Sequence, residues 1–241
     1  MTEDVAGAPD ADAVGAELAA VLESAARLQS IVPGAVLVGG SAAALYAAHR
    51  QSYDHDHVLV DLRDRFELVL DALEREGDFV VNRVSAGKII LGELGGIETG
   101  VRQLIRARPL DIQQVRLRDG SSLTVPTAAE ILRIKGFLIV KRNQARDYLD
   151  VAALAARYGV EPAARVLAGI DDYYRDDAKP AGDRAVRDQL IRQLCGPAPR
   201  DRTTTRRLAH YKGLAARWHN WAAVVEQCRL IAARILAEGA D

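Results

Sequence analysis

The sequence predicts an α+β protein: an N-terminal mixed sheet with flanking helices, followed by an all-helical C-terminal half. Short apolar runs alternate with amphipathic segments as far as Val125, whereas beyond Pro126 the apolar residues keep helical spacing only. The chain has 241 residues, 49% hydrophobic and 27% charged, which is typical of soluble globular proteins and excludes a mainly disordered or collagen-like chain. We therefore expect a sheet domain over residues 1–126 and a helical domain over residues 127–241.

Strands and helices are both predicted in the N-terminal half. Val14, Leu18 and Leu22 recur at helical spacing in the first helix, which Pro33 ends. Short apolar runs between turn residues indicate strands. The predicted helices span residues 11–31, 41–49 and 65–76, and the predicted strands span residues 35–38, 57–60, 79–84, 88–91, 97–105, 110–117 and 123–125.

The C-terminal half begins with a helix start signal. Thr127 and Glu130 have the spacing of a capping box, in which the two side chains bind the free N–H groups of the first turn. From there onward we expect helices only, with breaks near Asn143, at Gly159, at Asp171, and at residues 179–182 and 196–199.

Cysteine content and hydropathy exclude several classes of protein. Cys195 and Cys228 are the only cysteines and no Cys/His cluster is present, so neither a zinc site nor a disulfide framework is supported. No apolar run reaches membrane-spanning length, and the acidic N-terminus lacks the basic flank of a secretion signal. We therefore expect a cytoplasmic protein with no membrane partner.

Positive charge gathers near the C-terminus. The formal net charge is −1, yet the segment of residues 200–234 is mostly basic and includes Arg206, Arg207 and Arg217. Such a segment can bind nucleic acid through its phosphates, and neighbouring aromatic residues such as Trp218 can stack on bases. A solvated basic face, with the tryptophans in the core, is the alternative.

A glycine turn joins the first predicted strand to the next helix. Gly39 and Gly40 let the backbone approach a ligand closely, the helix N-terminus offers free N–H groups, and Ser41 adds a hydroxyl donor. Together these groups suit the phosphates of a nucleoside triphosphate. Taken alone, the same residues also fit an ordinary strand-to-helix turn.

Two aspartates follow at the entry to the second predicted strand. Asp54 and Asp56 are two apart, so strand alternation turns both to one face. Close carboxylates repel unless a cation lies between them, and Mg²⁺ prefers one or two carboxylates together with substrate phosphates. Asp111, between Leu110 and Ile112 on a later predicted strand, is the candidate third carboxylate. A polar loop for the pair and a solvent-facing Asp111 are the alternatives.

This arrangement resembles the nucleotidyltransferase superfamily that includes DNA polymerase β. It resembles more closely the AbiEii/AbiGii-type nucleotidyltransferase toxins of abortive-infection toxin–antitoxin systems. Four ordered motifs carry the resemblance: the glycine turn, the run HRQSYDHD of residues 49–56, the helix around Lys135, and the run RNQARDYLD of residues 142–150. The chain beyond Ile170 carries no motif of this family.

The resemblance implies a Mg²⁺-dependent enzyme that transfers an NMP from an NTP to an RNA such as tRNA, or to a protein hydroxyl. It implies the toxin of a type IV-like toxin–antitoxin system, with a possible cognate antitoxin as partner, and a helical domain that completes the active site. The implied metal ligands are Asp54, Asp56 and Asp111.

The remaining implied roles concern the nucleotide. Gly39, Gly40, Ser41, Arg50, Ser52, Lys135 and Asp150 would bind it, and Asp54, Asp56, Asp111, Lys135 and Asp147 would be catalytic. The residues themselves leave alternatives open. Lys135 can snorkel from an apolar helix face, Asp147 can pair with Arg142 or Arg146, and Arg50 can brace its loop.

His55 and His57 depart from the family pattern, which has aliphatic residues there. A histidine that faces a sheet interior needs a hydrogen bond, so these two are either tolerated structurally or functional. Two other functions stay open: transfer to a small molecule of the antibiotic type, and a catalytically silent binding or antitoxin module that keeps the fold.

Overall fold

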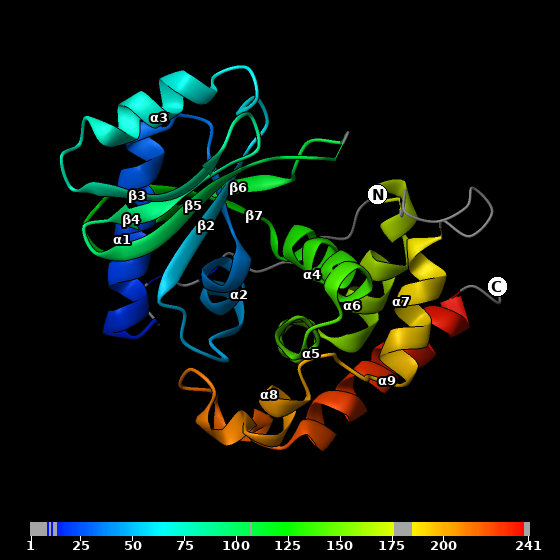
Figure 1. Ribbon diagram of the computed structural model, residues 1–241. Coiled ribbons are helices and arrows are strands. Elements are labelled where there is room, and N and C mark those ends of the chain that lie inside the picture. Colours follow the sequence, from blue (N-terminus) through cyan, green and yellow to red (C-terminus); the bar gives the residue numbers. More distant parts are fainter. Residues whose placement is uncertain (1–8, 10, 12–13, 107, 176–184, 239–241) are drawn as a thin grey trace. The chain divides into compact units, whose positions relative to one another are not determined.

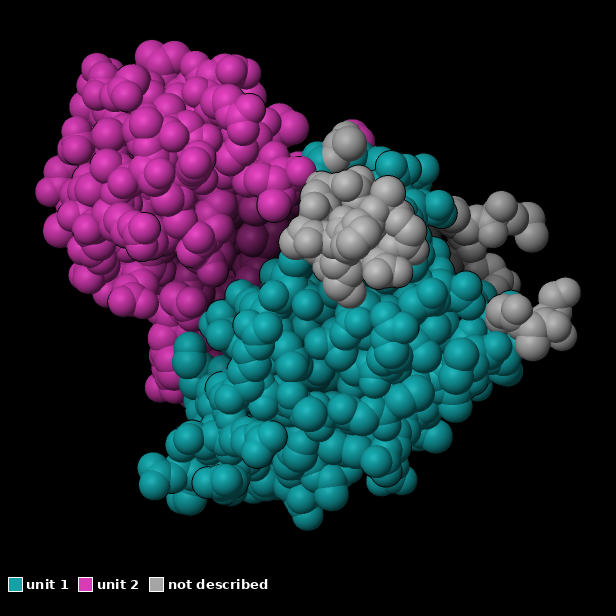
Figure 2. All heavy atoms as spheres, turned by 45° about the vertical axis from the view of Figure 1, so that its right-hand side comes forward, with its two compact units in different colours: residues 1–7, 106–108, 128–241 teal, residues 8–105, 109–127 magenta. Residues whose placement is uncertain are grey.

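The computed structural model describes residues 9, 11, 14–106, 108–175 and 185–238. The chain divides into two compact units, which Figure 2 shows in separate colours. The sheet unit comprises residues 8–105 and 109–127, and the helical unit comprises residues 1–7, 106–108 and 128–241. After the long first segment of the sheet unit, the chain therefore passes into the helical unit at residues 106–108, and again at Ala128.

A five-stranded mixed sheet is the frame of the sheet unit (Figure 1). β2 and β5 run parallel, and the other neighbouring pairs are antiparallel. The predicted mixed sheet is confirmed. The predicted hairpin is confirmed as well, since residues 79–85 pair antiparallel with residues 89–94. In spatial order the strands are β1 (Val36–Val38), β2 (Asp54–Leu59), β5 (Ile97–Gln103), β4 (Ile89–Leu94) and β3 (Phe79–Ser85).

Apolar residues of the first and third helices share a core with one face of this sheet. Leu28 and Leu73 from the helices meet Leu59, Ile90 and Val101 from the strands, and all five are buried. The three strand residues lie on one face of the sheet. Val101 pairs with Ile90 and with His57, and Leu59 is two residues from His57 on the same strand. The helices of the unit are α1 (Ala16–Ile31), α2 (Gly39–Ala47) and α3 (Phe66–Glu74).

Three helix and strand starts differ from the prediction. α1 begins at Ala16, not at residue 11, because Gly15 lies outside the helix in an extended conformation (φ −64°, ψ 157°). α2 begins at Gly39 itself, so the glycine turn is the first turn of the helix. β2 begins at Asp54, because its polar residues keep strand alternation, with His55 and His57 buried.

The last two strands of the unit form a separate antiparallel sheet, β6 (Ile112–Arg116) with β7 (Ser122–Pro126). The prediction that Asp111 lies on a strand beside the aspartate pair is therefore wrong. The neighbours of β2 are β1 and β5, and Asp111 precedes β6. Its carbonyl oxygen accepts a hydrogen bond from the Thr127 N–H at 2.8 Å, next to the paired strands.

Helices alone, with no strand, make up the described part of the helical unit, as the sequence predicts. Asn143 (φ +50°) and Gly159 (φ +101°) interrupt the helices at two of the predicted breaks, whereas residues 179–182 lie outside the described residues. None of the described helices is long and apolar enough to cross a membrane. The helices are α4 (Ala128–Arg142), α5 (Ala145–Tyr158), α6 (Val160–Ala168), α7 (Val186–Cys195), α8 (Arg202–Arg206) and α9 (Trp221–Glu238), with the 3₁₀ turns η2 (Ile170–Asp172), η4 (Leu208–His210) and η5 (Ala216–Trp218).

A buried carboxylate marks the first turn of α4. Glu130 is fully buried, and its oxygens accept hydrogen bonds from Arg106 at 2.5 and 3.0 Å and from Arg133 at 3.0 Å. Arg106 lies in the short segment of residues 106–108, which precedes β6 in the sequence and belongs to the helical unit. The residue predicted for a capping box thus binds two arginines, one of them distant in sequence.

Candidate functional site

The aspartates of β2 form one half of the candidate site. Asp54 and Asp56 are both partly exposed and lie on the face of β2 opposite to His55 and His57. Ser52 donates a hydrogen bond from its hydroxyl to Asp54 Oδ1 at 3.1 Å. Strand alternation therefore turns the two carboxylates the same way, as the sequence predicts.

The start of α2 lies directly against these carboxylates. Gly39 has a φ of +78°, and a Cβ added there would stand 3.3 Å from Asp56 Oδ2. At Gly40 a Cβ would stand 2.7 Å from an Arg50 guanidinium nitrogen and 2.9 Å from Ser52 Oγ. The glycines are thus required for close packing, and they leave the first N–H groups of the helix near the carboxylates.

The start of α2 and the carboxylates of Asp54 and Asp56 form a corner of the sheet unit. Buried side chains nearby stabilise this corner. Ser41 is fully buried and its hydroxyl donates to the main-chain oxygen of Asp54, which ties α2 to β2. Arg50 is 6% exposed and donates to the Gln51 carbonyl at 3.2 Å. The predicted phosphate contact of the Ser41 hydroxyl is therefore not available in this arrangement, whereas the backbone N–H groups beside it can serve.

The third predicted metal ligand is not part of this corner. Asp111 lies outside the five-stranded sheet, and within the described ranges no group of three His, Cys, Asp or Glu side chains is placed to hold a metal ion. Asp54 and Asp56 remain as a pair. One or two carboxylates, with substrate phosphates and water completing the shell, are what Mg²⁺ prefers, so the pair fits this ion.

The second half of the predicted site lies in the helical unit. Lys135 Nζ is 2.6 Å from Asp150 Oδ2 and 4.0 Å from Asp147 Oδ1. Asp147 instead binds Arg142 through two hydrogen bonds of 2.7 Å. The side chains of Lys135, Asp147 and Asp150 are at most 2% exposed. The structure thus places Lys135 with both aspartates, and the alternative pairing of Asp147 with Arg142 is also present.

Of the two predictions for the tryptophans near the basic segment, base stacking or a place in the core, the core position holds for Trp218. Trp218 is buried, although Arg217 lies 4.8 Å from its ring centre. Trp221 is partly buried and makes an edge contact with the Tyr148 ring at 6.0 Å. Arg206, Arg207 and the neighbouring Arg202 are exposed.

Solved structures of known proteins have the same architecture. MenT4, a nucleotidyltransferase toxin from Mycobacterium tuberculosis, aligns over 91% of this chain and 82% of its own, with a TM-score of 0.56 and 20% identity. An H. pylori protein assigned as a nucleotidyltransferase aligns over 93% of this chain and 97% of its own, with a TM-score of 0.52 and 13% identity. This chain has a nucleotidyltransferase fold. At these identities, the likeness concerns the fold alone.

The sequence relatives of this chain are named as transport, uptake or export proteins. The heme uptake protein MmpL11 of Mycobacterium tuberculosis is 30% identical over an alignment of 248 positions that covers 92% of this chain and 23% of that protein. The mycolic acid-containing lipids exporter MmpL11 of Mycolicibacterium smegmatis is 28% identical over an alignment of 239 positions that covers 93% of this chain and 22% of that protein. The chain thus spans less than a quarter of these relatives. No family model matches it.

Within the nucleotidyltransferase fold, β5 adds residues that the sequence analysis missed. Asp54 pairs with Glu98 and Asp56 with Gly100 in the parallel register. A Cβ at Gly100 would stand 3.0 Å from Asp56 Oδ1 and 2.7 Å from a Leu91 methyl carbon. Arg102 Nε lies 3.5 Å from Asp56 Oδ1. A glycine in mid-strand is the one local signal that could have indicated close packing here.

The histidines of β2 point into the core of the fold. His55 meets Ser24 Oγ at 3.0 Å and Thr99 Oγ1 at 2.9 Å, and burial lowers the pKa of His55 to about 4. His57 is fully buried beside it, with ring centres 5.3 Å apart. Neither His57 ring nitrogen makes a hydrogen bond of good geometry among the described residues, although the Ala25 main chain lies within its reach. Burial and the neighbouring His55 lower the pKa of His57. Both imidazoles are therefore neutral at pH 7 and belong to the core.

Proposed function

We propose that this protein is a Mg²⁺-dependent nucleotidyltransferase that transfers an NMP from an NTP to a hydroxyl group of an RNA such as tRNA, with release of pyrophosphate. The observation that carries the proposal is the corner of the sheet unit where Gly39 lies so close to the Asp56 carboxylate that an added Cβ would stand 3.3 Å from Oδ2. A helix N-terminus and two aligned carboxylates meet there, in a fold shared with nucleotidyltransferases.

The residues of this corner have distinct tasks in the proposal. The N–H groups at the start of α2, with the positive end of its dipole, bind the phosphates. Asp54 and Asp56 hold Mg²⁺, which when bound neutralises charge that develops on the leaving pyrophosphate. Ser41, Arg50 and Ser52 position these groups through the contacts given above. Asp111 is left out of the proposed ligand set, because the described residues include no group of three such side chains placed to hold a metal ion.

The lysine of α4 is proposed as a phosphate ligand. Its ammonium group is held by Asp150 at 2.6 Å, so Asp150 fixes the position of the charge. Asp147, bound to Arg142, is proposed as a positioning residue for the same group. Since Lys135 already has a carboxylate partner, it would bind phosphate as a shared cation and add less affinity than a free lysine.

One observation supports the proposed acceptor, and another supports the proposed biological role. The exposed arginines of the basic segment, among them Arg202, Arg206 and Arg207, favour a polyanionic acceptor over a small molecule. The fold of the MenT4 toxin supports a toxin role in the cytoplasm, with a cognate antitoxin as partner. A protein acceptor, a small-molecule acceptor and a silent binding module are the outcomes that compete with this proposal.

Incubation with each labelled NTP, Mg²⁺ and total RNA tests the proposal. Label in RNA that disappears with EDTA and with Asp56→Asn supports it. Label in protein or in a small molecule would show that RNA is not the acceptor. If no NTP gives label with any divalent ion, the silent binding module is favoured. As an independent test, NTP and Mg²⁺ together should raise the Tm, since binding at a hundredfold excess over Kd adds about 2.7 kcal/mol.

A further inference from the structure

The carboxylate of Asp56 lies between two glycines. On the side of β1, an added Cβ at Gly39 would stand 3.3 Å from Asp56 Oδ2. On the side of β5, Gly100 pairs with Asp56, and an added Cβ there would stand 3.0 Å from Oδ1. Since β2 lies between β1 and β5 in the sheet, the two carboxylate oxygens face different neighbours. The Oδ2 side belongs to the start of α2, and the Oδ1 side belongs to β5.

A cation lies on the Oδ1 side of this carboxylate. Arg102 follows Gly100 by two residues on β5, so both residues are on the same face of the sheet as Asp56. Arg102 Nε lies 3.5 Å from Asp56 Oδ1. Because Gly100 has no side chain, no side chain of β5 separates the guanidinium group from the carboxylate. The glycine therefore allows Arg102 to reach across to β2.

Most of the Arg102 guanidinium group is left for another ligand. The side chain is 46% exposed, and its contact with Asp56 is the one ion pair that it forms with the described residues. That contact uses Nε. The two terminal nitrogens carry four further N–H donors, and none of them donates a hydrogen bond within the described ranges. A planar fork of this kind matches the oxygens of a phosphate group.

The two sides of Asp56 thus offer different donors to a nucleotide. In nucleotidyl transfer, the α-phosphate reacts between the leaving pyrophosphate and the acceptor. If the N–H groups of α2 bind the pyrophosphate part on the Oδ2 side, two kinds of phosphate can reach the Oδ1 side. One is the α-phosphate itself, and the other is a backbone phosphate of the RNA acceptor.

We propose that Arg102 is a substrate ligand that binds a phosphate oxygen on the β5 side of Asp56, and that Asp56 Oδ1 positions its guanidinium group. This inference rests on the proposed nucleotidyl transfer and adds a residue to it. The competing role for Arg102 is to offset the charge of Asp56 without touching a substrate.

The two roles predict opposite signs for one measurement. Removal of a cation beside Asp56 tightens the binding of a divalent metal ion in either role, because a repulsive neighbour is lost. If Arg102 only offsets charge, the metal-dependent binding of a nucleotide tightens as well. If Arg102 binds phosphate, the affinity for the phosphate-bearing substrate falls instead.

The variant Arg102→Gln, in the full chain, separates these roles. Three Kd values are measured: for Mn²⁺ alone by electron paramagnetic resonance, for the α,β-methylene analogue of each NTP with Mg²⁺ by calorimetry, and for tRNA without nucleotide by filter binding. The Mn²⁺ Kd should fall by up to about fivefold. The Kd of the ligand that supplies the phosphate should rise about tenfold, and Arg102→Lys should recover part of this loss.

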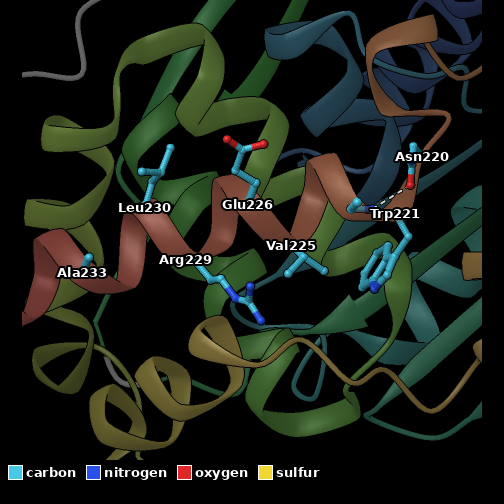
Figure 3. A pocket seen from close by; sticks show the side chains of 8 residues that line it. Asn220, Trp221, Val225, Glu226, Arg229, Leu230 and Ala233 are labelled. Carbon is cyan, nitrogen blue, oxygen red and sulfur yellow. Dashed lines mark hydrogen bonds between the residues drawn. The ribbon is translucent and has the colours of Figure 1, made fainter.

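Two arginines serve as matched controls. Arg83 is exposed and lies on the same sheet face as Asp56, three strands away or about 14 Å. Arg229, in the helical unit, also has its Nε engaged, by the Cys195 carbonyl at 3.1 Å. Figure 3 shows Arg229 among the side chains that line a hollow of about 740 Å³ along α9. Arg83→Gln and Arg229→Gln remove the same charge and should leave the Kd of the NTP analogue unchanged.

The possible results divide clearly. A weaker affinity of Arg102→Gln for the NTP analogue assigns the α-phosphate, and a weaker affinity for tRNA assigns the acceptor backbone; either result supports the proposal. Unchanged or tighter binding of both ligands would overturn it, as would an equal loss in Arg83→Gln. If the unchanged protein binds neither ligand, the proposed function fails too, whereas normal binding that is indifferent to Arg102 contradicts this inference alone. Circular dichroism checks that each variant is folded.

Discussion

The two groups of charged side chains that the sequence singles out differ in exposure and in pairing. Asp54 and Asp56 are partly exposed on β2, and Arg102 approaches Asp56 no closer than 3.5 Å. In the helical unit, Lys135 and Asp150 are fully buried and pair at 2.6 Å. A buried pair cannot lose one member without leaving an unpaired charge. A partly exposed carboxylate pair loses repulsion, together with at most a solvent-screened contact such as that of Arg102 with Asp56. Removal of one carboxylate is therefore expected to lower activity at the β2 pair, and to lower stability at the pair of Lys135 with Asp150.

The largest effect is expected on activity, from Asp56→Asn. If Asp56 is a metal ligand, nucleotidyl transfer should fall by a factor of about 10² to 10³, as for loss of one group that stabilises developing charge. The free energy of unfolding should change by less than about 1 kcal/mol, because the carboxylate is partly exposed and has a carboxylate neighbour. Transfer rates and urea unfolding measure the two quantities. Full activity of the variant with Mg²⁺ would contradict the metal assignment.

The next effect is on stability, from Asp150→Ala. This change leaves the Lys135 ammonium group buried beside Asp147 at 4.0 Å only, and should cost about 3–5 kcal/mol in urea unfolding. The control Lys135→Met/Asp150→Leu removes both charges and should regain most of that loss. A loss as large in the control as in the single variant would mean that packing, and not the unpaired charge, is responsible.

The histidines of β2 give a smaller effect that depends on pH. The pKa of His55 is lowered from 6.5 to about 4 by burial, so below pH 6.5 the unfolded chain binds a proton that the native protein binds only near pH 4. Stability is full above pH 6.5 and is lost as the pH falls; at pH 5 this histidine alone costs about 2 kcal/mol. His57, whose pKa burial also lowers, adds to the same loss, so His57→Leu should flatten the decrease in the free energy of unfolding between pH 7 and pH 5, measured by urea unfolding. An unchanged slope would show that His57 does not contribute.

The smallest effect concerns Arg206, Arg207 and Arg217, which are all exposed. In the variant Arg206→Ala/Arg207→Ala/Arg217→Ala, each removed phosphate contact should lower the slope of log K against log salt by about 0.7 for single-stranded RNA. NTP binding, measured by the shift in Tm, should stay unchanged. RNA binding over a salt series checks this, and an unaltered slope would place the acceptor elsewhere.

Local patterns were enough to predict the open carboxylate pair. Asp54 and Asp56 share a face because strand alternation is local, and Gly39 indicates a close approach because few other residues adopt its φ of +78°. The outcome required no knowledge of distant contacts. The polar character of the residues did hide the true start of β2, since buried histidines at alternate positions resemble a loop in sequence.

Contacts between distant segments could not be predicted in this way. Asp111 was placed beside β2 because its segment reads as a strand, but which sheet a strand joins depends on pairing that the segment does not encode. Gly100 and Arg102 lie beside Asp56 only through the register of β2 with β5. For Lys135, the helix face was predictable, whereas the choice of Asp150 as nearest partner depends on the packing of α4 on α5.

The ion pair of Arg106 with Glu130 has a consequence for how the gene can be divided. Residues 127–241 look like a piece that evolution could move on its own, yet this piece lacks Arg106, which binds its buried Glu130 at 2.5 and 3.0 Å. A transplanted helical half would lose both Arg106 hydrogen bonds and keep the one from Arg133. A helical half cut at residue 127 is therefore expected to be destabilised by the buried charge of Glu130, unless residues 106–108 are kept or that charge is removed as well.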